Sequence, residues 1–67
     1  MVTTAEHIIC LRKQLSLTQK AVAEKLNLTQ PSISRYENGQ NIPNDVLIMM
    51  AQFYGKTTDY LLGLTNH

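Results

Sequence analysis

Several residue types that constrain a fold are scarce in this chain. Its single cysteine, Cys10, excludes an internal disulfide and suits a reducing compartment. Only two prolines and three glycines occur among 67 residues, and this shortage of helix-breaking residues favours helices. Aromatic residues make up 6% of the chain, so aliphatic side chains must build the core. The length is sufficient for one domain with one modest core.

The sequence also lacks the patterns that mark secretion, membrane insertion or catalysis. No apolar run is long enough to span a membrane and no signal-peptide pattern occurs, so a cytoplasmic protein is expected. There is no Ser/His/Asp or Cys/His set, no pair of carboxylates and no glycine-rich phosphate loop, so the sequence does not predict an enzyme. His7 and Cys10 stand three residues apart, but two ligands do not make a metal site. We therefore expect no metal, no cofactor and no small-molecule ligand.

Charge is low and nearly balanced. Charged residues make up 16% of the chain, and the formal net charge is +1. Proteins that bind nucleic acids usually carry a clear excess of basic residues. The segment 25–36 nevertheless includes Lys25 and Arg35 and no acidic residue. The sequence therefore allows a locally positive face on an almost neutral protein.

Apolar spacing and capping residues predict five helices, and no segment shows the alternation of a strand. The first helix begins at Thr3 or Thr4, and the next three span about Gln19–Leu26, 30–37 and Asp45–Tyr54. A last short helix stops at Gly63. The predicted N-caps are Thr3 or Thr4, Thr18, Thr29, Asn44, and Thr57 or Thr58. The residues expected to face inward are Ile8, Leu11, Leu15, Val22, Ala23, Leu26, Ile33, Tyr36, Leu47, Met50, Ala51, Tyr54, Tyr60, Leu61 and Leu62.

Residues 18–39 are the most informative stretch of the sequence. Two short amphipathic helices meet there at a tight turn, where Asn27 tolerates the positive φ that such a turn needs. The second helix directs Gln30, Ser34 and Arg35 away from the core and along one side. Such a face is either an ordinary solvated surface or a surface that contacts bases, because a short helix of this kind fits the major groove of DNA.

Short motifs follow one another in a defined order from about Ile8 to Gly63. These motifs are Leu11-Arg12, Leu17-Thr18-Gln19, Val22-Ala23, Lys25-Leu26, Thr29-Gln30, Ile33-Ser34, Tyr36-Glu37-Asn38-Gly39, Ala51 and Thr58-Asp59-Tyr60-Leu61-Leu62-Gly63. In this order they make the chain similar to the Cro/cI-type (XRE) helix-turn-helix family of phage and bacterial repressors. The resemblance implies an all-α, compact five-helix bundle of the lambda-repressor-like type, with the helix-turn-helix formed by helices 2 and 3. It also implies that residues 1–67 form a single DNA-binding domain.

The same resemblance assigns roles to individual residues. The residues expected to contact bases are Thr29, Gln30, Pro31, Ser34 and Arg35. The residues expected to contact phosphates are Thr18, Gln19, Asn38 and Gln40. Gln19 is also expected to brace the first residues of the recognition helix. Arg12 and Glu37 are expected to form a partly buried ion pair that positions this helix without touching DNA.

Side-chain chemistry agrees with the expected base contacts. The amide of Gln30 matches N6 and N7 of adenine, and the guanidinium of Arg35 can bind O6 and N7 of guanine. Three features depart from the family pattern: Pro31 replaces a polar residue, Asn27 replaces a frequent turn glycine, and the loop after Gly39 lacks Lys and Arg. Because the loop after Gly39 lacks basic residues that could bind phosphates, we expect a modest affinity for DNA that depends strongly on dimerisation and salt.

The sequence as a whole predicts a sequence-specific DNA-binding transcriptional regulator that acts as a repressor. We expect a homodimer on a pseudo-palindromic operator, with half-sites about 34 Å apart on double-stranded DNA. The dimer interface is expected at Leu61, Leu64 and their neighbours. The alternative for these side chains, and for Met49 and Phe53, is to complete the core of one subunit.

Two alternative functions remain open at this point. In the first alternative, the chain is the N-terminal DNA-binding part of a larger repressor. It can also be a protein-binding module of the antitoxin or antirepressor type, for which the low net charge and the apolar Met49, Phe53 and Leu64 argue. A regulatory enzyme fits the sequence less well than either.

Overall fold

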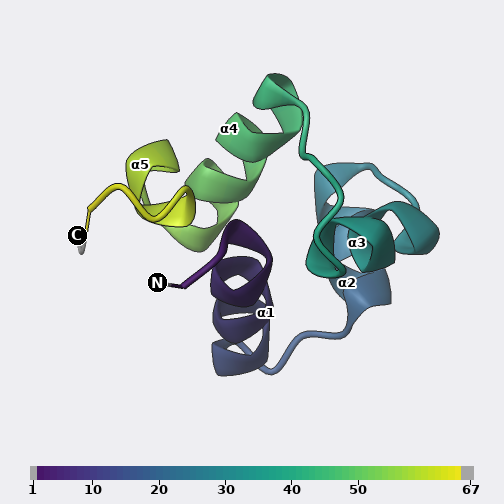
Figure 1. Ribbon diagram of the computed structural model, residues 1–67. Helices are drawn as coiled ribbons and strands as arrows, with labels where there is room; N and C mark the ends of the chain where they lie inside the picture. The colour runs from purple at the N-terminus through teal and green to yellow at the C-terminus, as the bar shows by residue number, and fades with distance from the viewer. Residues whose placement is uncertain (1, 66–67) are drawn as a thin grey trace.

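Five α-helices and their short connections make up the computed structural model, which describes residues 2–65 (Figure 1). The helices are α1 (Thr4–Gln14), α2 (Gln19–Leu26), α3 (Gln30–Glu37), α4 (Asn44–Tyr54) and α5 (Thr58–Leu61). No strand occurs in this part of the chain. The predicted all-α, five-helix fold is therefore confirmed.

Threonine caps four of the five helices, as the sequence predicts. The hydroxyls of Thr3, Thr18, Thr29 and Thr57 each accept a hydrogen bond from the backbone N–H three residues later. At α1 the cap is reciprocal, because the Glu6 carboxylate also accepts from the backbone N–H of Thr3 at 3.3 Å. Each such bond satisfies one of the N–H groups that a helix start leaves unpaired.

The predicted cap of α4 is wrong. Asn44 is already the first helical residue, and Pro43 takes the cap position with extended backbone (φ −56°, ψ 148°). The carbonyl of Pro43 accepts from the N–H of Leu47 at 2.9 Å, so the helix begins one residue earlier than the preference of Asn for cap positions suggests. No side chain caps α4, although Asp45 Oδ1 accepts from the N–H of Val46 at 3.0 Å within its first turn.

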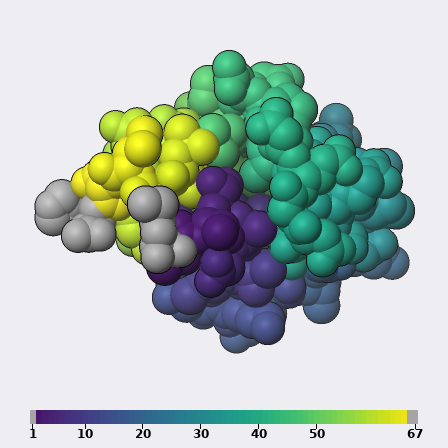
Figure 2. Space-filling view, viewed as in Figure 1, coloured from purple at the N-terminus to yellow at the C-terminus, as the bar shows by residue number. Residues whose placement is uncertain are grey.

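The helices divide into two groups on either side of α1. In Figure 1, α2 and α3 lie together on one side of α1, and α4 crosses above it toward α5 on the other side. The start of α1 comes close to the chain that follows α5, since a Cβ built on Gly63 would lie 3.2 Å from the Val2 carbonyl oxygen. Figure 2 shows this purple N-terminal segment between the yellow C-terminal segment and the teal chain around the end of α3.

One apolar core lies between these groups. Its fully buried side chains come from all five helices: Ile8, Val22, Ile33, Met50 and Leu61. Val46 is also buried although the sequence analysis did not place it inward, whereas Leu15 is exposed because α1 ends before it. Tyr36 and Tyr54 are only partly buried.

The structure contradicts the assignment of Leu61 to a dimer interface. Leu61 is 0% exposed, so no atom of it can contact a second subunit without unfolding α5. Leu64, three residues later, is 72% exposed, and Leu62 is also exposed. The difference arises because Leu61, the last residue of α5, belongs to the core, whereas Leu62 and Leu64 follow the end of this helix.

Candidate nucleic-acid interface

A tight turn joins α2 to α3 and sets the angle between them. Asn27 ends α2 in the left-handed region (φ 57°, ψ 41°), as predicted for a residue at this position. The N–H of Leu28 then donates to the carbonyl of Ala23 at 2.8 Å, which closes the turn. Pro31 lies in the first turn of α3, where its missing N–H costs no helical hydrogen bond. The result is a helix-turn-helix unit with α3 at the surface.

The expected ion pair between Arg12 and Glu37 is present at the base of α3. Arg12 Nε donates to Glu37 Oε2 at 2.7 Å, and Arg12 Nη2 donates to Oε1 at 2.9 Å. The side chains are only 13% and 5% exposed. Arg12 Nη1 also donates to the carbonyl of Leu17 at 2.9 Å, so one guanidinium connects α1, the chain before α2 and the end of α3.

This ion pair affects the ionisation of two neighbouring groups. The hydrogen bond from Arg12 to Glu37 raises the pKa of the guanidinium, although burial opposes this change. Burial raises the pKa of the nearby Tyr54 to about 12, and the negative charge of Glu37 contributes to the rise. The Arg12 guanidinium therefore stays charged, and Tyr54 stays neutral beside it, across the physiological pH range.

Two glutamine side chains extend this network from the ion pair to the surface. Gln19 Nε2 donates to Glu37 Oε1 at 3.0 Å, and Gln30 Nε2 donates to Gln19 Oε1 at 2.7 Å. Gln19 is partly buried, whereas Gln30 is exposed. The structure therefore brings together the two residues that the sequence analysis assigned to bracing and to base contact.

The outward face of α3 carries the residues predicted to contact bases. Four of them are exposed and one, Ser34, is partly buried; the exposed ones are Thr29, Gln30, Pro31 and Arg35. Sequence reasoning missed one member of this face, Ser32. Its Oγ accepts from Arg35 Nη2 at 3.2 Å and lies 2.9 Å from Thr29 Oγ1. The spacing of three residues between these polar side chains allows such contacts, but it does not by itself predict them.

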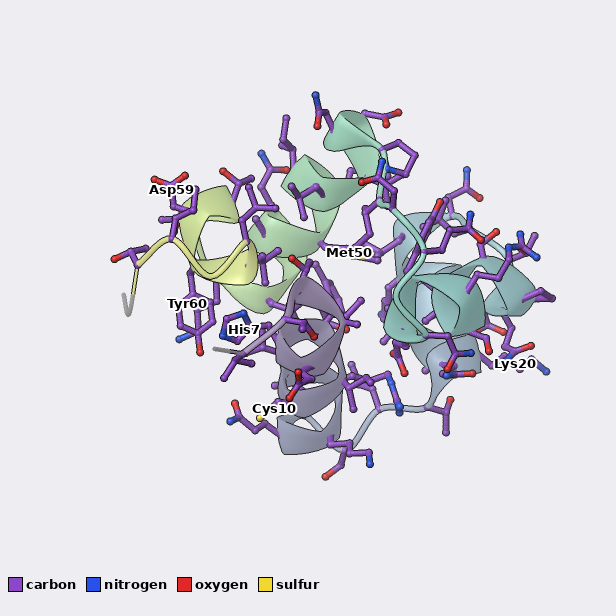
Figure 3. All side chains as sticks on the ribbon, in the orientation of Figure 1. His7, Cys10, Lys20, Met50, Asp59 and Tyr60 are labelled. Carbon is purple, nitrogen blue, oxygen red and sulfur yellow. The ribbon has the colours of Figure 1, made fainter. Side chains whose placement is uncertain are left out.

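The residues predicted to contact phosphates lie at both ends of this face. Thr18 is exposed at the start of α2, where its hydroxyl accepts from the N–H of Ala21 at 3.0 Å. Asn38 and Gln40 are exposed at the opposite end of α3, after its last turn. Lys20 is exposed in the first turn of α2, next to Gln19 in the sequence (Figure 3). These positions flank the predicted base-contacting face, and contact with phosphate stays a prediction.

His7, which the sequence analysis weighed as a metal ligand, has a packing role. Its Nδ1 lies 3.2 Å from the carbonyl oxygen of Leu61, and its ring stacks on Tyr60 with centroids 4.8 Å apart (Figure 3). Lys56 Nζ lies 4.9 Å from the centre of the same Tyr60 ring. Among residues 2–65 there is no group of three or more His, Cys, Asp or Glu side chains that could hold a metal ion.

Comparisons with known proteins agree on one family. A family model described as helix-turn-helix matches residues 11–61. The HTH-type transcriptional regulator ImmR of Bacillus subtilis (strain 168) is 42% identical over 53 residues, which cover 78% of this chain and 42% of ImmR. The uncharacterized HTH-type transcriptional regulator YobD of the same organism is 39% identical over 57 residues, 84% of this chain and 51% of YobD. The chain thus spans about half, or less, of the length of these relatives.

A solved structure shows the same fold over nearly the whole chain. It is the crystal structure of the P22 c2 repressor protein in complex with synthetic operator 9T in the presence of Tl+. The TM-score is 0.87 at 26% sequence identity, and the match covers 97% of this chain and 100% of the repressor chain. The family resemblance inferred from sequence motifs is thereby confirmed. The protein described here belongs to the Cro/cI-type helix-turn-helix family of transcriptional regulators.

Proposed function

We propose that this chain is a sequence-specific DNA-binding transcriptional regulator, with α3 as the helix that enters the major groove. The observation that carries the proposal is the exposed polar face of α3, on which Gln30 and Arg35 are held by side-chain hydrogen bonds. The likeness to a repressor whose structure contains operator DNA supports the same role. Held side chains lose less entropy on binding, which suits the recognition of base edges.

The proposed contacts follow from the position of each residue. The proposed base contacts are Thr29, Gln30, Pro31, Ser34 and Arg35. The proposed phosphate contacts are Thr18, Gln19, Asn38 and Gln40. Phosphates also suit the starts of α2 and α3, because free N–H groups and the positive end of the helix dipole face outward there.

The proposed regulator is a repressor that acts in the cytoplasm as a homodimer on a pseudo-palindromic operator. The net charge of +1 supports dimerisation, because one copy supplies few cations for phosphate contacts. Leu64 is the remaining candidate for the interface now that Leu61 is assigned to the core. We propose that the 67 residues act as one DNA-binding domain, whether alone or within a longer repressor. No described helix is long and apolar enough to cross a membrane.

A salt titration tests the DNA-binding proposal. The protein is selected on a library of random double-stranded DNA, and affinity for the enriched sequences is measured between about 50 and 200 mM salt. We expect log K to fall linearly with log salt, and Arg35→Gln to weaken binding. Lys56→Gln is the matched control, because Lys56 lies over Tyr60 of α5, and α5 and α3 lie on opposite sides of α1 (Figure 1). Absence of binding at the lowest salt, or equal effects of both variants, would contradict the proposal.

A protein-binding module is the second candidate function. The low net charge and the exposed Leu62 and Leu64 favour it. Met49 and Phe53 support it less than the sequence suggested, because both pack against the core. A monomer that fails to bind DNA in the salt titration is the outcome that would favour this function.

A further inference from the structure

We propose that Glu37 is a specificity-determining positioning residue, which fixes through Gln19 the hydrogen-bonding pattern that Gln30 presents to DNA. This inference rests on the proposed function, because it concerns the base that Gln30 contacts. It goes further in assigning an influence on base preference to a buried residue that does not reach the surface. The three side chains form an unbroken series of hydrogen bonds of 3.0 and 2.7 Å.

The first step is that Glu37 accepts hydrogen bonds and donates none. Both of its oxygens already accept from the Arg12 guanidinium, which has only donors, so both oxygens act as acceptors in this pairing. The group of Gln19 that faces Oε1 of Glu37 must therefore be its NH2 group. The carbonyl oxygen of the Gln19 amide then necessarily points the other way, toward Gln30.

The second step carries this orientation to the surface. Because Gln19 Oε1 is an acceptor, the group of Gln30 that lies 2.7 Å from it must be the NH2 group. One hydrogen of Gln30 Nε2 is used in this bond. The carbonyl oxygen Oε1 and the second Nε2 hydrogen of Gln30 remain for a partner. The amide orientation of Gln30 is thus set by the chemistry of Glu37, two residues further into the network.

The third step identifies the base edge that matches this pattern. Adenine presents N6–H2 as a donor beside N7 as an acceptor in the major groove, which complements one acceptor and one donor of Gln30. Guanine presents two acceptors, O6 and N7, and would place O6 or N7 against the carbonyl oxygen of Gln30. We therefore infer that the fixed amide selects adenine and disfavours guanine at the base pair that Gln30 contacts.

Replacement of Glu37 by glutamine removes the fixed direction while keeping the shape. A glutamine at this position has one acceptor oxygen for Arg12 and Gln19 to share. If that oxygen turns toward Arg12 Nε, the new NH2 group opposes the Arg12 Nη2–H, faces Gln19 and reverses the amides of Gln19 and Gln30. If it turns toward Gln19, the NH2 group opposes the Arg12 Nε–H. No single arrangement is imposed, so Gln30 no longer presents one pattern.

Base preference in selected DNA tests the inference. The position contacted by Gln30 is first located as the one whose preference disappears in Gln30→Ala, and adenine is expected there. In Glu37→Gln we expect the ratio of affinities for adenine and guanine at that position to fall at least about fivefold, the lower end of what a good bidentate contact provides. The matched control is Arg12→Lys, which disturbs the same buried pair but leaves a carboxylate facing Gln19. It is expected to keep the adenine preference even where it lowers stability.

Three results would overturn the inference. They are a preference for guanine at this position in the unchanged protein, an unaltered adenine preference in folded Glu37→Gln, and an equal loss of preference in Arg12→Lys. Circular dichroism of each variant establishes whether it is folded. If Glu37→Gln does not fold, the orientation of the Gln19 amide in the unchanged protein decides whether the inference holds.

Nuclear magnetic resonance of the free, unchanged protein measures that orientation without DNA. The side-chain Nε2 protons of Gln19 are expected to show nuclear Overhauser contacts to the γ protons of Glu37. Contacts from these Nε2 protons to the side chain of Gln30 instead would show the reversed orientation and contradict the inference. This measurement also separates the two proposals, because absence of DNA binding with the expected contacts defeats the proposed function and leaves the fixed orientation in place.

Discussion

The Arg12 guanidinium donates two hydrogen bonds to the Glu37 carboxylate, at 2.7 Å from Nε and 2.9 Å from Nη2. These residues are 25 positions apart in the sequence, and their pairing joins α1 to the end of α3. Both side chains are largely shielded from water, so each charge depends on the other for its stabilisation. The pair therefore holds the proposed recognition helix in place without lying on its outward face.

We expect Glu37→Ala to lower the free energy of unfolding by about 3–5 kcal/mol, because it leaves the Arg12 charge buried and unpaired. A loss of this size approaches the total stability of a chain of this length. Urea denaturation followed by circular dichroism measures it. Glu24→Ala, which removes an exposed acid on α2, should change stability by no more than about 0.5 kcal/mol. Similar effects of the two substitutions would show that the ion pair is not effectively buried.

Tyr54 gives the protein a stability limit at high pH. Its pKa in the folded protein is about 12, above the ordinary value of 10.0, because burial disfavours the phenolate. The neutral form is thus favoured by folding, so this contribution is complete below pH 10 and is lost as the pH rises from 10 through 12. Since Tyr54 is only partly buried, we expect the loss to be about 1 kcal/mol, less than the full pKa shift implies.

The comparison with Tyr54→Phe isolates this effect. Urea denaturation at pH 8 and pH 11 should show a smaller decrease for the variant than for the unchanged protein, because phenylalanine does not ionise. Deprotonation of lysines affects both proteins equally and cancels in the comparison. The same decrease in both proteins would assign the pH dependence to other groups.

Leu61 and Leu64 are expected to respond to substitution in opposite ways. Leu61→Ala should lower the free energy of unfolding by about 2–5 kcal/mol, because it leaves a cavity at a fully buried position. Leu64→Ala should leave the stability of a single subunit within about 0.5 kcal/mol, because its side chain lies mostly in solvent. Sedimentation equilibrium at several concentrations then tests the interface. If Leu64→Ala dimerises as well as the unchanged protein, Leu64 does not belong to the dimer interface.

These two leucines also illustrate what the sequence could and could not predict. Helix starts at Thr18 and Thr29 and the left-handed turn at Asn27 were predictable, because each depends on a few neighbouring residues. For Leu61 the sequence left both the core and the dimer interface open, because Leu61 and Leu64 have the same side chain and differ only in what α1 and α4 cover.

The contacts of the candidate site show the same division. The approach of Gln19 to Gln30 followed from family resemblance, not from spacing alone. The contact of Arg35 with Ser32 depends on side-chain conformations at the surface of α3, and the contact of His7 with Leu61 joins residues 54 positions apart. Neither has a local sequence pattern strong enough to predict it.

The two proposed kinds of DNA contact can be separated by how substitutions change affinity across many sequences. Gln30→Ala and Arg35→Ala should each reduce discrimination at one or two positions by about 1–3 kcal/mol, because they remove contacts to base edges. Gln40→Ala should weaken binding to all sequences alike, since a phosphate contact carries no base information.

Gln19→Ala should combine both effects, since the structure shows that Gln19 Oε1 accepts the hydrogen bond from Gln30 Nε2. Its loss therefore removes a proposed phosphate contact and also frees the amide of Gln30 to rotate. Binding to a panel of single-base operator variants, measured at one fixed salt concentration, gives affinity and preference together. A purely uniform loss in Gln19→Ala would mean that Gln30 contacts its base correctly without this support, and that the hydrogen bond between the two amides has no part in specificity.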